Sequence, residues 1–153
     1  MRNVFYRGKS MKNNKWVFGA PYIINECKED QLPLVACIIR WVEWDGTCGF
    51  MSPENQSIVE VFPESIGQFT GLIDINGINI FEGDILKSGT ANLCLSRVYF
   101  NESELTFYRH SFLENSSYYF PLFKNFDIHK FKIIGNVHDN IELISKQNRK
   151  EII

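Results

Sequence analysis

Residues 62–86 read Phe-Pro-Glu-Ser-Ile-Gly-Gln-Phe-Thr-Gly-Leu-Ile-Asp-Ile-Asn-Gly-Ile-Asn-Ile-Phe-Glu-Gly-Asp-Ile-Leu, and this stretch decides the fold class. Three regularly spaced glycines, Gly71, Gly77 and Gly83, divide it into short apolar segments. Each glycine stands where a β-rich chain has to turn sharply. Asn76-Gly77 is the strongest of these signals and predicts a type I′ hairpin turn, which needs positive φ at both central residues.

The rest of the chain agrees with a β protein. Its 153 residues fit one domain or two small subdomains, and at that length an apolar core can form without disulfides or metals. Aromatic residues make up 14% of the chain, and aromatic side chains favour strands over helices. Apolar residues recur mostly with a period of two, which is the period of a strand. The sequence therefore predicts an all-β fold.

Several strands and turns follow from this periodicity. Gly19 and Pro21 should interrupt the strand predicted over residues 15–24. This strand should lie at an edge or end at a bulge, because proline lacks a ladder donor. The segment 112–126 is rich in aromatics but aperiodic, and is predicted to include a long loop. The remaining predicted strands are 35–44, 47–51, 58–62, 85–86, 93–100, 105–109 and 131–137, with an Asp45-Gly46 hairpin turn, a turn at 101–104, short helical turns at 63–67 and 138–144, and a frayed end at 145–153.

The acids of the central stretch have two interpretations. In Glu82-Gly83-Asp84, two carboxylates two residues apart would point to one face of an extended segment and could flank a substrate. The favoured interpretation is structural: Gly83 takes a strained conformation and Asp84 accepts hydrogen bonds from the backbone at a strand entry. Asp74 and Thr70 have a similar structural interpretation beside their turns.

The sequence gives little support to an enzyme, a metal site or a cofactor. The four cysteines form no Cys-x-x-Cys pair, the three histidines lie far apart, and no nucleophile motif is present. We therefore predict no catalytic residues, no metal and no cofactor. The amino terminus has no apolar secretion run, and no stretch has the length of a membrane span, so we expect a cytoplasmic protein without a membrane partner. Cys37 and Cys94 are predicted to be small core residues.

Charge is distributed unevenly along the chain. Residues 1–25 carry five basic side chains and no acid, although the whole chain has a net charge of −2. The basic segment could meet nucleic acid or could pair with acids of the same molecule. If an exposed recognition patch exists here, its candidates are the basic side chains and the aromatic residue that lie close in sequence: Arg7, Lys9, Lys15 and Trp16.

The order of motifs resembles the YopX family of phage and prophage proteins. Arg7-Gly8-Lys9 and Trp16-Val17-Phe18-Gly19 match its amino-terminal elements. Residues 67–85 match every specified position of its central block, which reads Gly-Gln-Phe/Tyr-Thr-Gly-Leu-x-Asp-x-x-Gly-x-x-Ile-x-Glu-Gly-Asp-Ile. Ile134-Gly135-Asn136 matches its last element, although Ile141 stands where that family usually has proline and His138 where it often has tyrosine. The family-motif positions with expected structural roles are Thr70, Gly71, Asp74, Gly77, Glu82, Gly83, Asp84, Gly135 and Asn136.

The resemblance implies more about fold than about chemistry. It implies an SH3-like roll with a carboxy-terminal turn over residues 67–153, and an amino-terminal β subdomain over residues 1–66 packed against it. The function we expect is that of an accessory binding module. A protein partner comes first, either a host factor or a second copy of the chain, because small barrels leave strand edges that recruit other strands. Nucleic-acid binding through the basic segment is the alternative, and catalysis by Glu82 and Asp84 is a third possibility.

Overall fold

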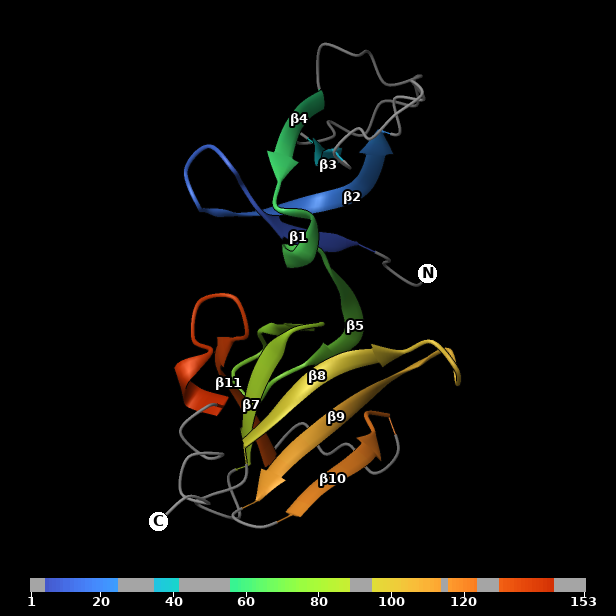
Figure 1. Cartoon of the computed structure of the whole chain (residues 1–153), viewed down its shortest axis with the longest axis vertical. Coiled ribbons are helices and arrows are strands. Elements are labelled where there is room, and N and C mark those ends of the chain that lie inside the picture. The colour runs from blue at the N-terminus through green and yellow to red at the C-terminus, as the bar shows by residue number, and fades with distance from the viewer. Residues whose placement is uncertain are drawn as a thin grey trace, which may run out of the picture. The chain divides into compact units, whose positions relative to one another are not determined.

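The computed structural model describes residues 5–24, 35–41, 56–88, 95–113, 116–123 and 130–144. These residues form antiparallel strands in two compact units, Met1–Gln68 and Phe69–Ile153 (Figure 1). The helical segments in the described part are single turns, the 3-10 turn η2 (Pro63–Ser65) and a turn at 142–144. The predicted all-β class is confirmed.

The strands of the first unit pair in succession, and a bridge joins the last of them to the residue that follows the first. β1 (Tyr6–Lys9) pairs with β2 (Trp16–Ile24), β2 with β3 (Val35–Trp41), and β3 with β4 (Gln56–Val61). The end of β4 returns to the residues after β1, where Ser10 and Val61 form a bridge. Val61 is fully buried there against Tyr6, Val17 and Ile66.

β2 differs from its predicted form in one respect. It runs through Gly19 and Pro21 without a break, so the predicted interruption is wrong. Instead the strand changes partner at this point: Gly19 pairs with Tyr6 of β1, and Ala20 pairs with Ile39 of β3. In the described residues, Pro21 therefore has a paired strand on one side only, which is where a missing N–H is tolerated.

The second unit contains a five-stranded antiparallel sheet in the order β10-β9-β8-β7-β11. β5 (Gly67–Ile73) begins in the first unit and, in the second, pairs with β6 (Asn79–Phe81). The core of the second unit consists of the buried side chains of Ile80, Leu86, Val98, Phe107, Leu122 and Phe131. The five strands of the sheet are β7 (Asp84–Ser88), β8 (Leu95–Asn101), β9 (Thr106–Leu113), β10 (Ser116–Pro121) and β11 (Phe131–Asn136).

The hairpin at Asn76-Gly77 is present, but its turn is of another type. The N–H of Gly77 donates to the carbonyl of Asp74 at 2.9 Å, and the N–H of Asp74 donates to the carbonyl of Ile78 at 2.8 Å. Of the two central residues only Gly77 has positive φ, at +78°. The predicted type I′ turn is therefore wrong, because a three-residue loop with a left-handed glycine closes the hairpin.

Of the other predicted elements, some are confirmed, one is wrong in part, and some lie outside the described residues. The hairpin of 93–100 with 105–109, the last strand and the helical turn near residue 142 are confirmed. The loop predicted within 112–126 is wrong over β10, which is a regular strand. The SH3-like form of the second part stays a prediction. The Asp45-Gly46 hairpin, the strand at 47–51, the tail at 145–153, Cys94 and the side chain of Cys37 lie outside what the structure describes.

Candidate functional site

The carboxylate of Asp74 is buried and holds together two segments of the second unit. Its Oδ1 accepts hydrogen bonds from the N–H groups of Asn76 at 2.7 Å and Ile78 at 2.9 Å. Its Oδ2 accepts one from the N–H of Ile133 at 3.1 Å, in a strand 59 residues away. Burial by itself raises the pKa of Asp74, but these backbone donors and the Asn76 amide lower it below its ordinary value. Asp74 is therefore an ionised structural carboxylate.

Glu82 and Asp84 also accept hydrogen bonds from the main chain. The N–H of Phe81 donates to Oδ2 of Asp84 at 2.8 Å, and the N–H of Phe100 donates to Oε1 of Glu82 at 3.1 Å. Asp84 is 1% exposed, so it is not open to a substrate. Asp84 accepts this main-chain hydrogen bond at the entry of β7, directly after Gly83, whose φ is +85°.

The remaining family-motif positions also have structural contacts. The hydroxyl of Thr70 donates to the carbonyl of Ile80 at 2.8 Å and accepts from the N–H of Leu72 at 3.3 Å, which fixes the chain on both sides of Gly71 (φ +87°). Oδ1 of Asn136 accepts from the N–H groups of His138 and Asp139 in the carboxy-terminal turn.

The side chain of Asn140 lies close to Gly135, the residue before Asn136, and leaves little room for a side chain there. A Cβ atom at this position would lie 2.4 Å from Oδ1 and 3.0 Å from Cβ of Asn140, so any side chain here would require Asn140 to move. Within the described residues, no group of three or more histidines, cysteines or acids has the geometry of a metal site.

The predicted recognition patch does not form as expected. Arg7 is 8% exposed, and its guanidinium lies 4.6 Å from the ring centre of Trp16. The expectation of an exposed arginine is therefore wrong: the register of β1 against β2 places Arg7 close to Trp16, and the two side chains stack. Lys15 is exposed, whereas Lys9 and Trp16 are half-buried. A recognition role for the two lysines stays a prediction.

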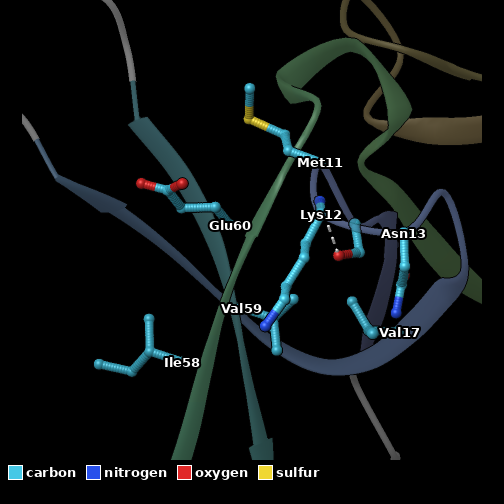
Figure 2. Close-up of a pocket in the computed structure, with 8 residues that line it drawn as sticks. Met11, Lys12, Asn13, Val17, Ile58, Val59 and Glu60 are labelled. Atoms are coloured by element: carbon cyan, nitrogen blue, oxygen red, sulfur yellow. Dashed lines mark hydrogen bonds between the residues drawn. The ribbon is translucent and has the colours of Figure 1, made fainter.

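The first unit carries an open pocket of about 730 Å³ (Figure 2). Its walls come from the loop after β1, the start of β2 and the end of β4. Half of its lining residues are apolar and half are polar, and the polar half includes one cation, Lys12, and one anion, Glu60. It contains no histidine or cysteine, so the lining offers no acid–base or metal-binding set. The lining residues are Ser10, Met11, Lys12, Asn13, Val17, Ile58, Val59 and Glu60.

The most distinctive surface of the second unit is its edge strand β10. It is the last strand of the five-stranded sheet and, among the described residues, pairs only with β9 (Figure 1). Its three consecutive aromatic side chains are exposed: Tyr118 by 48%, Tyr119 by 58% and Phe120 by 39%. Large aromatic side chains with this exposure on a sheet edge are typical of interaction surfaces.

The hydrogen-bond pattern of β10 shows which of its backbone groups point outward. The N–H of Leu122 donates to the carbonyl of Phe107, and the register continues from there without a shift. In an antiparallel ladder, bonded and non-bonded pairs alternate. Tyr118 and Phe120 therefore bond to β9. Ser117, Tyr119 and Pro121 direct their backbone groups away from it, and Pro121 lacks an N–H in any case.

The rings of β10 are held in place from both faces of the sheet. Tyr118 and Phe120 stack on each other with ring centres 6.2 Å apart. On the same face, the guanidinium of Arg109 lies 4.4 Å from the centre of Phe120 and 4.9 Å from that of Phe131. On the opposite face, Tyr119 stacks on His110 of β9. These contacts fix the orientation of the exposed rings before any partner binds.

A tyrosine–histidine cluster, formed by Tyr99, Tyr108, His110 and Tyr119, lies on that opposite face. Tyr119 stacks on His110 at 4.3 Å and meets Tyr99 edge-on at 6.2 Å. Burial, followed by the positive charge of Arg97, lowers the pKa of His110, and burial, followed by the charges of Tyr119 and Glu104, raises the pKa of Tyr99. Both rings are therefore uncharged at neutral pH.

Sequence reasoning missed this surface. The signal was present as Tyr118-Tyr119-Phe120 within an aromatic segment, but adjacent aromatics on both faces of a strand give no alternation. A strand exposed on both faces cannot be recognised from a period of two.

Comparisons with known proteins give a family and a distant similarity to solved structures. A family model described as YopX protein matches residues 5–145. The crystal structure of protein EF1440 from Enterococcus faecalis is similar at 19% sequence identity, with a TM-score of 0.45, and the match covers 94% of this chain and 99% of that chain. A search of curated protein sequences found no significant match. In the described residues, no helix is long and apolar enough to cross a membrane.

Proposed function

The chain belongs to the YopX family over residues 5–145, and on that premise we propose that it is an accessory protein that binds another protein through the outer edge of β10. The setting we propose is the cytoplasm of a phage-infected or prophage-carrying host cell, which follows from the family resemblance. The proposal replaces the amino-terminal basic patch with an aromatic strand edge as the recognition surface.

One observation carries the proposal: β10 combines outward-directed backbone groups with three exposed aromatic rings. An extended segment of a partner can add to such an edge as a further strand. Main-chain hydrogen bonds at Ser117 and Tyr119 would supply affinity, and the exposed rings would supply specificity and buried apolar area. Aromatic side chains are enriched at the centres of protein interfaces for this reason.

A binding function is also favoured over catalysis by the state of the acids. Asp74, Glu82 and Asp84 all accept hydrogen bonds from backbone N–H groups. A carboxylate that accepts a main-chain hydrogen bond in this way helps to fix the conformation of the chain. Catalysis by Glu82 and Asp84 therefore has no support from the geometry of these acids.

A peptide-display experiment tests the proposal. A library of random linear peptides is panned against the folded chain, and the enriched peptides are measured for binding to the wild type and to Tyr119→Pro. This change removes an N–H that does not bond to β9, so the hairpin retains its ladder. Tyr119→Thr, which keeps the N–H and is favourable in strands, is the matched control.

We expect the enriched peptides to be rich in aromatic and β-branched residues. Their affinity should fall at least about tenfold in Tyr119→Pro, which corresponds to the loss of about 1.4 kcal/mol. The affinity should fall less in the Tyr119→Thr control, because this change removes the ring but keeps the main-chain hydrogen bond. Enriched peptides that bind Tyr119→Pro as well as the wild type would contradict the proposal.

Nucleic acid is the alternative partner. The exposed side chains of Lys12 and Lys15 favour nucleic-acid binding. Arg7 is buried, so the basic segment presents one positive charge fewer on its surface. Fluorescence anisotropy with a labelled single-stranded oligonucleotide tests this alternative. Binding through phosphate contacts should weaken steeply with added salt and should fall in Lys12→Ala/Lys15→Ala. Binding that does not respond to salt, or no binding at low salt, would reject it.

A further inference from the structure

We infer that the strand which adds to β10 is β10 of a second copy of this chain, antiparallel to the first and related to it by a two-fold axis at Tyr119. This inference rests on the proposed function, because it names the partner of the same strand edge. Cyclic dimers with a two-fold axis are the commonest assemblies of soluble proteins, and they require a surface that complements itself. A dimer of this kind therefore requires β10 to be complementary to itself.

The backbone of β10 is self-complementary in this register. With Tyr119 opposite Tyr119 of the second copy, each N–H would donate to the other carbonyl across the axis. Ser117 would then lie opposite Pro121 of the second copy, and its N–H would donate to that carbonyl. The N–H groups that the two Pro121 residues lack, one in each copy, would be the donors absent from the ladder. All three residues direct their backbone groups away from β9.

The side chains decide between this register and its neighbour. Placing the axis at Tyr119 puts Tyr118 opposite Phe120 of the second copy, so every exposed ring of β10 meets another aromatic ring. Placing the axis at Tyr118 would put Tyr119 opposite Ser117 and would leave Phe120 without an aromatic partner. The first register buries more apolar surface, so it is favoured.

β10 also lacks the features that keep edge strands apart. Natural proteins protect exposed edges with charged residues, especially lysine, and with prolines or bulges. The sequence of β10, Ser-Ser-Tyr-Tyr-Phe-Pro, contains no charge, and its proline comes at the end of the strand. An uncharged strand carries no charge pattern that would select a different partner or repel its own copy.

A charge-swap experiment tests the two-fold pairing. Tyr119→Lys and Tyr119→Glu are each made in the full chain, and molar mass is measured by sedimentation equilibrium over a range of concentrations. In a two-fold pair residue 119 faces itself, so either variant places like charges opposite each other, whereas a mixture places lysine opposite glutamate. Ser103→Lys, in the turn after β8 and away from β10, is the matched control.

The expected results are specific. The wild type and Ser103→Lys should rise from 17.8 kDa toward twice that mass as concentration increases. Each Tyr119 variant alone should stay at 17.8 kDa, and the equimolar mixture should again approach twice that mass. Recovery in the mixture also shows that both variants are folded. A wild type that stays monomeric, single variants that dimerise as the wild type does, or a mixture that stays monomeric would overturn the inference.

This result is independent of the peptide experiment. A monomeric wild type that still loses its selected peptides in Tyr119→Pro would reject the second copy as partner and keep β10 as a binding edge. If the wild type dimerises and both single charge variants dimerise equally well, the dimer contact lies outside β10. In that case the peptide experiment would decide whether β10 binds any strand.

Discussion

The ring centre of Tyr119 lies 4.3 Å from that of His110, and the two rings are 8° from parallel. This stack ties the exposed tyrosine of β10 to the neighbouring strand on the face that carries the tyrosine–histidine cluster. A ring that is already oriented loses less conformational freedom on binding than a free one. The histidine of this stack is also titratable, and burial followed by the charge of Arg97 lowers its pKa.

The first prediction concerns pH. Burial, with the charge of Arg97 as a second cause, lowers the pKa of His110, so the unfolded chain binds this proton more tightly than the folded one. Stability from His110 is therefore fully present above its unfolded pKa of about 6.5 and is lost as pH falls toward the lower folded pKa. Urea unfolding at pH 7.5 and 5.0 should show this loss in the wild type.

His110→Phe is the matched variant, because phenylalanine keeps an aromatic ring for the stack and cannot be protonated. Its free energy of unfolding should fall less than that of the wild type between the two pH values. Equal falls in the two proteins would show that His110 does not contribute to the pH dependence.

The second prediction concerns Asp74. Asp74→Asn replaces one carboxylate oxygen with an NH₂ group that cannot accept a hydrogen bond, so at least one of the N–H groups that bond to Asp74 loses its acceptor. The free energy of unfolding should fall by about 1–3 kcal/mol in urea titrations. An exposed control, Glu102→Gln, should stay within about 0.5 kcal/mol of the wild type.

Asp74 also predicts an acid limb of the stability curve. Its pKa is lowered, so its contribution is present above the unfolded pKa of about 3.9 and is lost as pH falls through the folded value. The variant Asp74→Asn should show a shallower loss of stability below pH 4 than the wild type. Parallel acid limbs in the two proteins would contradict the assigned role of the carboxylate.

The third prediction concerns Gly77. Its φ of +78° disfavours any L-residue, but a Cβ atom at this position would contact nothing within 4 Å. The cost of substitution therefore comes from the backbone alone, and it is larger for a β-branched residue than for asparagine. Gly77→Val should lower the melting temperature more than Gly77→Asn in calorimetry. Equal melting temperatures would mean that the loop changes conformation.

The fourth prediction concerns Arg7. Because its guanidinium is buried and lies over Trp16, Arg7→Ala should lower the free energy of unfolding by about 2 kcal/mol. Arg7→Lys keeps the charge but loses the planar stack, so it should recover only part of this loss. If Arg7→Ala instead left stability unchanged and weakened nucleic-acid binding, the original interpretation of an exposed patch would be correct.

The sequence predicted the fold class and the roles of the central acids, but not the surface. Short-range rules were sufficient for Asp74, Gly83 and Asp84, because turns depend on nearby residues. The same rules gave the wrong turn type at Asn76-Gly77, since a left-handed glycine serves both kinds of loop.

The errors on the surface came from pairing between strands. The burial of Arg7 depends on the register of β1 against β2, which places Trp16 beside it. The strand β10 depends on pairing with β9, which turns an aperiodic aromatic segment into an ordered edge. Local patterns carry no information on either pairing, so the candidate site could not be predicted from the sequence.

Amide hydrogen exchange of β10, followed by NMR, is the most direct measurement of the central claim. In dilute protein, the N–H groups of Tyr118 and Phe120 should exchange slowly because they bond to β9, whereas those of Ser117 and Tyr119 should exchange fast. Adding a selected peptide, or raising the protein concentration, should slow exchange at Ser117 and Tyr119. Fast exchange at these two amides under every condition, while the partner is bound, would contradict strand addition at β10.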